Sequence, residues 1–286
     1  MLRIGFVNVF FVDGQDGWVL VDAGLPKTGW LIRRAAEQRY GEGTRPQAIV
    51  LTHGHFDHAG AARELAEAWH TPVYAHPLEM PYLTGKSDYP PQDPTVGGAL
   101  ALLSRGFPHG GRDLGGHVYR LPDLGVVPGL ADWHWLPTPG HTAGHVSLLR
   151  ERDGVLLGGD VLATENQDSF FGMMTHRRSF NRPPAPFTTD WEAARQSLRE
   201  LGGYAITLVA AGHGAPMRVE GAQLREFAER LQAPRHGRYV TEPAHTDETG
   251  IVRLPPPAPD WLPRAAAMLA VAAIVGASAW SLAKRL

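Results

Sequence analysis

The sequence predicts an α+β fold in which two mixed β-sheets are faced by helices. A hairpin pattern opens the chain over residues 4–21, where β-branched and aromatic runs flank the turn sequence DGQDG. Strand and helix patterns then alternate, and consecutive strand patterns return near residue 132. Alternation favours parallel pairing and hairpins favour antiparallel pairing, so sheets of mixed direction are expected.

Each expected element follows from its hydrophobic period. Short apolar runs bounded by Gly, Pro or polar residues indicate buried strands, and apolar residues recurring every three to four positions indicate helices. Besides the hairpin, strands are expected at 47–51, 72–75, 132–137, 145–150, 154–159 and 205–210. Helices are expected at 27–39, 59–69, 190–201 and 220–232.

Two long segments, residues 77–131 and 164–189, have little period but contain many aromatic or methionine residues. Irregular insertions of this length in a compact domain are usually functional lids or disordered. Their composition favours a lid that forms an apolar substrate pocket. Packing over a helix is the alternative.

The carboxyl-terminal end is expected to be separate from the main domain, residues 1–232. Residues 233–263 are expected to be a Pro-rich linker, because 254–259 read LPPPAP. Residues 264–286 are expected to form a C-terminal hydrophobic helix, since the 19 residues 265–283 carry no charge. That length matches a bilayer span of about 20 residues. A helix docked on the main domain is the alternative.

Composition limits the partners and the compartment. The chain has no cysteine, which excludes disulfides and thiolate metal ligands. A net charge of −2 gives no basic field, so no nucleic-acid partner is expected. The amino terminus lacks a signal-peptide pattern, so we expect a cytoplasmic domain anchored in a membrane by its tail, with a soluble cytoplasmic protein as the alternative. The spacing of Ala272 and Gly276 makes a homodimer in lipid possible.

The most informative segment is residues 52–58, which read THGHFDH. It places three imidazoles and a carboxylate within six residues, on the loop that leaves a short apolar strand. Imidazole nitrogen and carboxylate oxygen together suit zinc and similar divalent ions. The segment therefore predicts a metal site.

Three later strand ends each carry glycine and a potential ligand. His141 follows Pro139-Gly140, Asp160 ends the run VLLGGD, and His213 stands in AAGHG. Glycine lets the backbone approach a metal closely or adopt a positive φ. Turns alone explain such a repeated pattern poorly.

These motifs, in this order after Asp22-Ala23-Gly24, resemble the metallo-β-lactamase superfamily of metallohydrolases over roughly residues 4–232. The resemblance implies a four-layer αββα sandwich, the metallo-β-lactamase fold. It implies that one metal ion is bound by His53, His55 and His141. A second would be bound by Asp57, His58 and His213, and Asp160 would bridge the two.

Two further residues are expected to support the ligands. Asp22 ends a strand, where it is either a turn residue or an acceptor that orients a ligand imidazole, and both roles are compatible. The resemblance places the metal ligand at His141, and His145 begins the next strand. His145 is therefore expected to lie behind the ligands.

The resemblance implies a zinc-dependent hydrolase with two Zn²⁺ ions and a small-molecule substrate. A metal-bridging hydroxide would attack an ester, thioester, lactone or related bond, and Asp57 would also act catalytically by orienting the nucleophile or moving its proton. The motifs look most like the glyoxalase II-like and lactonase-like branches. Ala163 stands where lactonases carry tyrosine, which argues against homoserine-lactone cleavage.

The alternative function is an oxidoreductase. Superfamily members that oxidise persulfides hold one Fe²⁺ with two histidines and an aspartate, which here match His53, His141 and Asp160. The full ligand set favours two metals over one.

Overall fold

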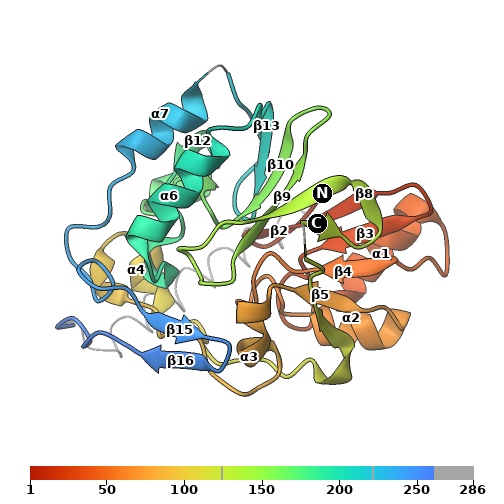
Figure 1. Cartoon of the computed structure of the whole chain (residues 1–286), viewed down its shortest axis with the longest axis horizontal. Helices are drawn as coiled ribbons and strands as arrows, with labels where there is room; N and C mark the ends of the chain where they lie inside the picture. The colour runs from red at the N-terminus through yellow and green to blue at the C-terminus, as the bar shows by residue number, and fades with distance from the viewer. Residues whose placement is uncertain (124, 221, 261–286) are drawn as a thin grey trace.

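Two six-stranded sheets pack against each other, and a pair of helices covers the outer face of each (Figure 1). The computed structural model describes residues 1–260, except residues 124 and 221. The layers follow the order α, β, β, α that the resemblance implies. The predicted mixed sheets are therefore confirmed.

The first sheet has the strand order β1-β2-β3-β4-β5-β6. Its strands are Leu2–Ile4, Val7–Asp13, Trp18–Val21, Ala48–Val50, Val73–Ala75 and Val118–Arg120. β1, β2 and β3 pair antiparallel, as hairpins do, and β3 to β6 pair parallel. The crossover from β3 to β4 is α1 (Gly29–Tyr40) and that from β4 to β5 is α2 (Ala62–Trp69), whereas residues 76–117 connect β5 to β6.

The second sheet has the order β14-β13-β10-β9-β8-β7. In chain order its strands are Val126–Val127, Leu130–Pro137, Val146–Arg150, Val155–Gly159, Leu208–Ala211 and Met217–Arg218. Its outer face is covered by α6 (Trp191–Leu201) and α7 (Gln223–Arg230). α6 begins where Asp190 accepts a hydrogen bond from the Ala193 N–H, at 2.9 Å.

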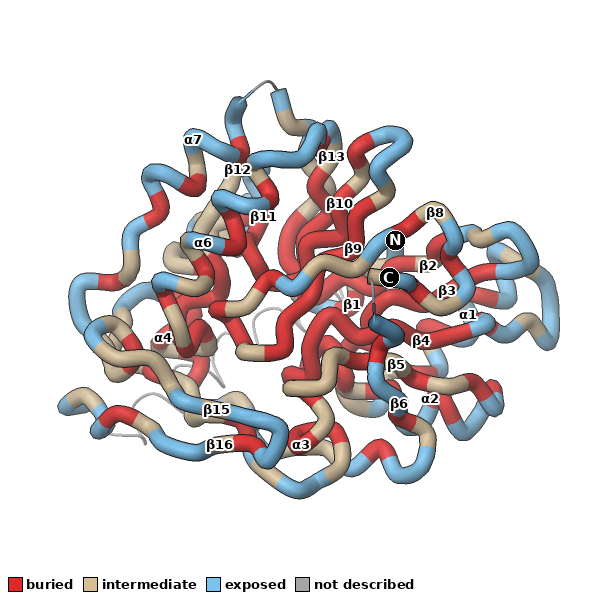
Figure 2. The backbone as a smooth tube through the Cα atoms, viewed as in Figure 1, coloured by how far each residue is buried: buried red, intermediate tan, exposed pale blue. Residues whose placement is uncertain are grey.

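The strand β4 shows why the central runs are apolar without alternation. Ile49 packs toward α1 and α2, whereas the next residue, Val50, packs between the sheets, and neither is exposed. Each fully buried side chain of this kind contributes roughly 1.5–3 kcal/mol. Figure 2 shows the buried backbone concentrated in the strands and the inner loops.

The two irregular segments contain short elements. Residues 77–131 include β6 and β7, the helices Met80–Leu83 (α3) and Ala99–Ser104 (α4), and the 3₁₀ turns Pro77–Glu79, Pro94–Val96 and Gly115–His117. Around residues 163–189 lie β11 (Ala163–Glu165), α5 (Phe170–Thr175), β12 (Arg178–Asn181) and the 3₁₀ turn Ala185–Phe187. Elements of two to six residues are too short to show a hydrophobic period, so the sequence did not reveal them.

Residues 233–260 do not form the free linker that the sequence predicts. They contain a hairpin, β15 (His245–Asp247) and β16 (Gly250–Arg253). The Tyr239 hydroxyl donates to the Pro91 carbonyl at 2.7 Å, and the Ala244 N–H donates to the Thr189 carbonyl at 3.0 Å. These bonds hold this segment against the two irregular segments, and in its Pro-rich end the Pro255 carbonyl accepts from the Arg238 side chain at 2.7 Å.

The expected C-terminal helix, residues 264–286, lies outside the described residues. Within the part of the chain that is described, no helix combines the length and apolar character needed to cross a membrane. The membrane anchor and the homodimer remain predictions.

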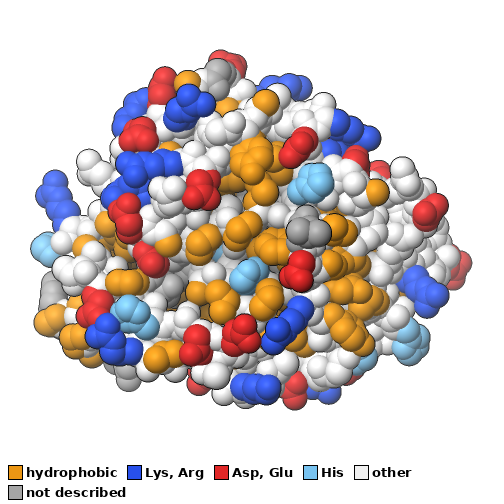
Figure 3. Space-filling view, in the orientation of Figure 1, with side chains coloured by type: hydrophobic (Ala, Val, Ile, Leu, Met, Phe, Trp, Pro, Cys, Tyr) orange, Lys and Arg blue, Asp and Glu red, His pale blue; other side chains and the backbone are white. Residues whose placement is uncertain are grey.

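On the face drawn in Figure 3, positive and negative side chains are interspersed around a central zone of hydrophobic ones.

Candidate metal centre

Seven side chains from four loops meet at one edge of the two sheets. The loop after β4 supplies four of them, and the loops after β8, β10 and β13 supply one each. They are His53, His55, Asp57, His58, His141, Asp160 and His213, and none is more than 8% exposed. They converge because the carboxyl ends of β4, β8, β10 and β13 lie at this shared edge.

The potential ligand atoms form three overlapping groups, each within 4.8 Å. One group is His53, His55 and His141, and another is Asp57, His58 and His213. These are the two sets that the resemblance assigns to separate ions. The third group, His53, His58 and Asp160, connects the other two.

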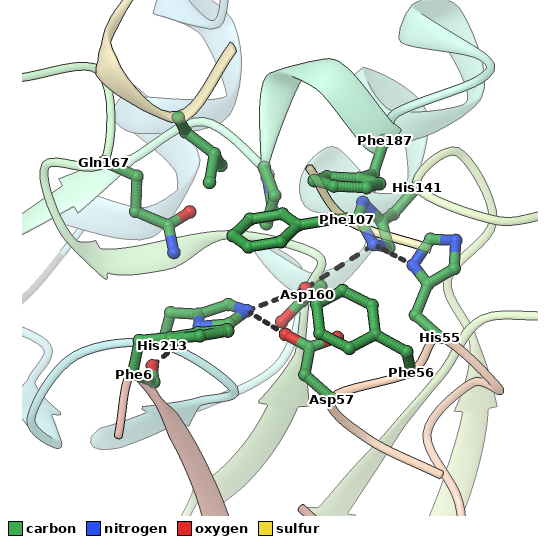
Figure 4. Close-up of a pocket in the computed structure, with 12 residues that line it drawn as sticks. Phe6, His55, Phe56, Asp57, Phe107, His141, Asp160, Gln167, Phe187 and His213 are labelled. Carbon is green, nitrogen blue, oxygen red and sulfur yellow. Dashed lines mark hydrogen bonds and ion pairs between the residues drawn. The ribbon is translucent and has the colours of Figure 1, made fainter. Parts of the chain in front are cut away.

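Asp160 occupies the centre of the cluster (Figure 4). Its Oδ2 lies 3.2 Å from His213 Nε2 and 3.5 Å from His141 Nε2. His213 Nε2 is also 3.5 Å from Asp57 Oδ2, and His55 Nδ1 is 2.9 Å from His141 Nε2. The seven groups thus face a common interior.

Three polar atoms of the cluster are buried without a hydrogen-bond partner, namely His53 Nε2, His58 Nε2 and Asp160 Oδ1. His58 Nε2 and Asp160 Oδ1 lie 3.4 Å apart without hydrogen-bond geometry. Buried polar atoms in folded proteins are nearly always bonded. A divalent cation accepts such nitrogen and oxygen donors, so the residues present fit a metal site.

Asp22 lies behind two of the imidazoles. Its carboxylate is 2.8 Å from His58 Nδ1 and accepts from the Thr52 N–H and hydroxyl. The Thr52 hydroxyl in turn lies 3.1 Å from His53 Nδ1. One carboxylate therefore engages the Nδ1 side of both rings, leaving each Nε2 toward the cluster. Asp22 has a φ of 61°, a conformation rare for residues other than glycine.

His145 lies behind Asp160. Its Nε2 accepts from the Asp160 backbone N–H at 2.8 Å, and its Nδ1 is 3.1 Å from the Thr138 carbonyl. Both ring nitrogens are engaged, and burial lowers the pKa of His145 to about 4, which keeps the ring neutral. His145 is therefore not free to face a metal.

Three of the ligand imidazoles are neutral, whereas, against the effect of burial, the Asp160 carboxylate raises the pKa of both His58 and His213, so a cation bound by those two rings would displace a proton from each. Burial holds the pKa of His53 and His141 well below the ordinary value and lowers that of His55 to about 3, so these rings are neutral donors. Burial lowers the pKa of His213 as well, but the Asp160 carboxylate outweighs it and raises the value to about 9. Burial also raises the pKa of Asp57.

Sequence reasoning missed Glu79, a carboxylate with no exposed surface. It accepts hydrogen bonds from the Gly54 N–H at 2.9 Å, the Thr142 hydroxyl at 2.7 Å, the Gly144 N–H at 3.2 Å and the Tyr89 hydroxyl. Gly54 and Thr142 lie on two different ligand loops, so Glu79 ties these loops together. A lone glutamate in a segment without period gives no signal in the sequence.

A pocket opens onto the cluster (Figure 4). His55, Asp57, His141, Asp160 and His213 form its floor. Its walls are Phe6, Phe56, Leu100, Phe107, Gln167, Pro184 and Phe187. Both irregular segments contribute to these walls, which makes the pocket mostly apolar beside a polar floor.

Known proteins resemble this chain over most of its length. The Metallo-beta-lactamase superfamily profile matches residues 2–213. A protein of Bacillus subtilis (strain 168) named "Probable metallo-hydrolase YflN" is 43% identical over 238 residues, which is 81% of this chain and 90% of the relative.

Two solved structures share this fold. TTHA1623 in a di-iron-bound form is 28% identical, with a TM-score of 0.52 over 79% of this chain and 94% of that one. A B3 metallo-beta-lactamase with an active-site glutamic acid shares the fold, with a TM-score of 0.55 and 20% identity over 79% of this chain and 81% of that one. From the matched profile, the four layers and the ordered strand-end motifs, the chain belongs to the metallo-beta-lactamase superfamily, a superfamily of metallo-hydrolases.

Proposed function

We propose that this protein is a zinc-dependent hydrolase that binds two ions and cleaves an ester, thioester, lactone or related bond of a small molecule. The observation that carries the proposal is the set of three overlapping ligand groups at the floor of an apolar pocket. A concave site with a few convergent polar groups is typical of small-molecule enzymes.

In this proposal His53, His55 and His141 hold one ion, and Asp57, His58 and His213 hold the other. Asp160 lies between the two groups and contacts both. When bound, such cations lower the pKa of water from about 16 to about 7 and polarise a carbonyl oxygen. The buried unpartnered atoms of His53, His58 and Asp160 support this assignment.

Side chains of the protein would orient the attacking water and move its proton. Asp57 lines the pocket and lies 3.5 Å from His213. From this position Asp57 could take a proton from the attacking water and return it to the leaving group. Asp22 and His145 hold the ligands from behind, and the phenylalanines limit the access of other water.

The identity of the metal is the finer part of the proposal. A ligand set of nitrogen and oxygen suits zinc and also iron. The relative TTHA1623 is described in a di-iron-bound form. We propose zinc because the resemblance to metallohydrolases with two ions implies it. The metal analysis below measures iron as well as zinc.

The test is metal analysis of the purified full chain together with two assays. We expect about two zinc ions per chain and hydrolysis of 4-nitrophenyl esters. Asp57→Asn should lower kcat by about 100-fold or more, whereas Asp16→Asn, at an exposed carboxylate, should leave it unchanged. One iron per chain with persulfide-dependent oxygen uptake and no ester turnover would overturn the proposal in favour of the oxidoreductase.

A further inference from the structure

Gln167 is a buried amide that faces the pocket without a partner. Gln167 is 7% exposed, and its side-chain oxygen Oε1 has no hydrogen-bond partner among the described residues. Figure 4 shows the amide pointing into the pocket toward His213. An amide has two donors and two acceptor sites, and burial without bonding is unfavourable. This arrangement is expected where a bound molecule completes the bonding.

The backbone around Gln167 is fixed in place. The Leu100 N–H donates to the Gln167 carbonyl at 3.1 Å, and the Ala99 N–H donates to the Asp168 carbonyl at 2.9 Å. The Asp168 N–H donates to Asn166 Oδ1, also at 2.9 Å. The start of α4 therefore holds this segment, and the amide is presented from a rigid wall.

Four phenylalanines form most of the remaining wall in a continuous layer. Phe107 lies 5.9 Å from Phe6, 5.3 Å from Phe56 and 6.2 Å from Phe187, measured between ring centroids. All four rings are partly exposed and none belongs to the three hydrophobic clusters of the core. Their free faces suit the apolar part of a ligand.

Along its walls, the pocket offers no partner for a charge on the part of the substrate that lies away from the metal cluster. None of its lining residues, all of them described, is Lys or Arg, and its ionisable groups all belong to the metal cluster. Arg112 acts electrostatically on Asp57, but it does not line the pocket. Burying an unpaired charge is unfavourable, so the walls select against charged groups.

We propose, resting on the hydrolytic function above, that the substrate is a small uncharged ester with a second neutral polar group. Its apolar portion packs on the phenylalanine layer, and its second polar group, a ketone or hydroxyl, hydrogen-bonds to Gln167. The phenylalanine rings lie close together over the metal cluster, with centroids 5.3–6.2 Å apart, which limits the substrate to a compact molecule.

Three chromogenic esters of nearly equal shape test this inference on the metal-loaded full chain. They are the 4-nitrophenyl esters of levulinate, valerate and hemisuccinate, whose acyl chains end in a ketone, an alkyl group and a carboxylate. We expect kcat/KM to be about tenfold higher for levulinate than for either of the others. Equal or better turnover of the hemisuccinate would overturn the inference.

Substitution of Gln167 assigns the preference to its amide. Gln167→Leu should bring the levulinate-to-valerate ratio from about ten to about one. Gln196→Leu, the same change at an exposed site on α6, should leave the ratio unchanged. A ratio that persists in a folded Gln167→Leu protein, as judged by its melting temperature, would also overturn the inference. If Gln167→Leu does not fold, the kcat/KM ratios of the three esters, measured on the unsubstituted protein, still test the inference.

The two proposals fail differently. If the protein binds its metals but hydrolyses none of the three esters, the proposed function is wrong and the inference falls with it. If all three are hydrolysed without preference, the hydrolase stands and the inference about the substrate is wrong.

Discussion

Asp22 and His58 form a buried pair in which Oδ2 lies 2.8 Å from Nδ1, and neither side chain is exposed. The same carboxylate reaches His53 through the Thr52 hydroxyl. Asp22, which directly follows β3, thus orients two imidazoles on the loop after β4. Hydrogen bonds of this kind fix the tautomer and orientation of ligand histidines.

Asp22→Asn should therefore weaken metal binding by about 10- to 100-fold, because the amide lacks the second acceptor oxygen and the charge. Asparagine tolerates the positive φ of this position, so the backbone should be retained. Competition with a chromophoric chelator measures the affinity. Asp16→Asn is the control. Unchanged affinity in the Asp22 variant would show that Asp22 acts only as a turn residue.

His141 and His145 lie four residues apart and should respond differently to the same substitution. His141→Gln should lower the bound metal, because His141 Nε2 faces His55 and Asp160. His145→Gln should keep the metal but lower the free energy of unfolding by about 1–3 kcal/mol, since the Asp160 N–H loses a well-placed acceptor. Metal analysis and urea unfolding separate the two. His134→Gln, at an exposed position on β8, should change neither quantity. Loss of metal in His145→Gln with full metal in His141→Gln would reverse the roles.

Glu79→Leu should destabilise the fold by on the order of 3 kcal/mol or more, because several buried donors lose their acceptor at once. Glu79→Gln keeps one acceptor oxygen and should cost less. Urea unfolding of both variants checks the order. If Glu79→Leu is as stable as the native chain, the four hydrogen bonds do not hold the loops together.

The same residue predicts a pH dependence. Burial raises the pKa of Glu79 above its ordinary value of 4.5, although the Tyr89 and Thr142 hydroxyls oppose the shift. The folded state then binds the proton more tightly than the unfolded state. Its contribution to stability is present at low pH and is lost as the pH rises from about 4.5 through the raised pKa. The stability of the native chain relative to Glu79→Gln should therefore fall as the pH rises from about 4.5 through the raised pKa. A difference that grows over this range would contradict the direction of the shift.

Gly212 should tolerate no side chain. A Cβ there would lie 2.3 Å from Asp160 Oδ1 and 2.6 Å from His58 Cε1. Gly212→Ala should displace both side chains and lower metal content, with a smaller effect on secondary structure. Gly116→Ala is the control, since a Cβ at that position meets nothing within 4 Å. Metal analysis and circular dichroism measure the two effects, and full metal content in Gly212→Ala would refute the prediction.

Much of the fold and the ligand cluster could be predicted from the sequence, because both rest on local patterns. An apolar run such as residues 48–51 indicates a buried strand, and glycine followed by His or Asp marks its exit. Strands of each sheet place their exits along one side, and the packing of the two sheets brings His58 and His213 together, with ring centroids 5.6 Å apart, although 155 positions separate them. The C-terminal hairpin of residues 245–253 was missed, because its short strands alternate too briefly to be recognised.

The sequence by itself determined two mixed sheets faced by helices and the set of potential ligands. Only the tertiary structure decided what surrounds that set: Glu79 between two loops, His145 turned toward the Asp160 backbone, and Gln167 in the pocket wall. The physical reason is that periodicity reports which side chains are buried, whereas the partners of one buried carboxylate, imidazole or amide depend on which distant loops pack against it.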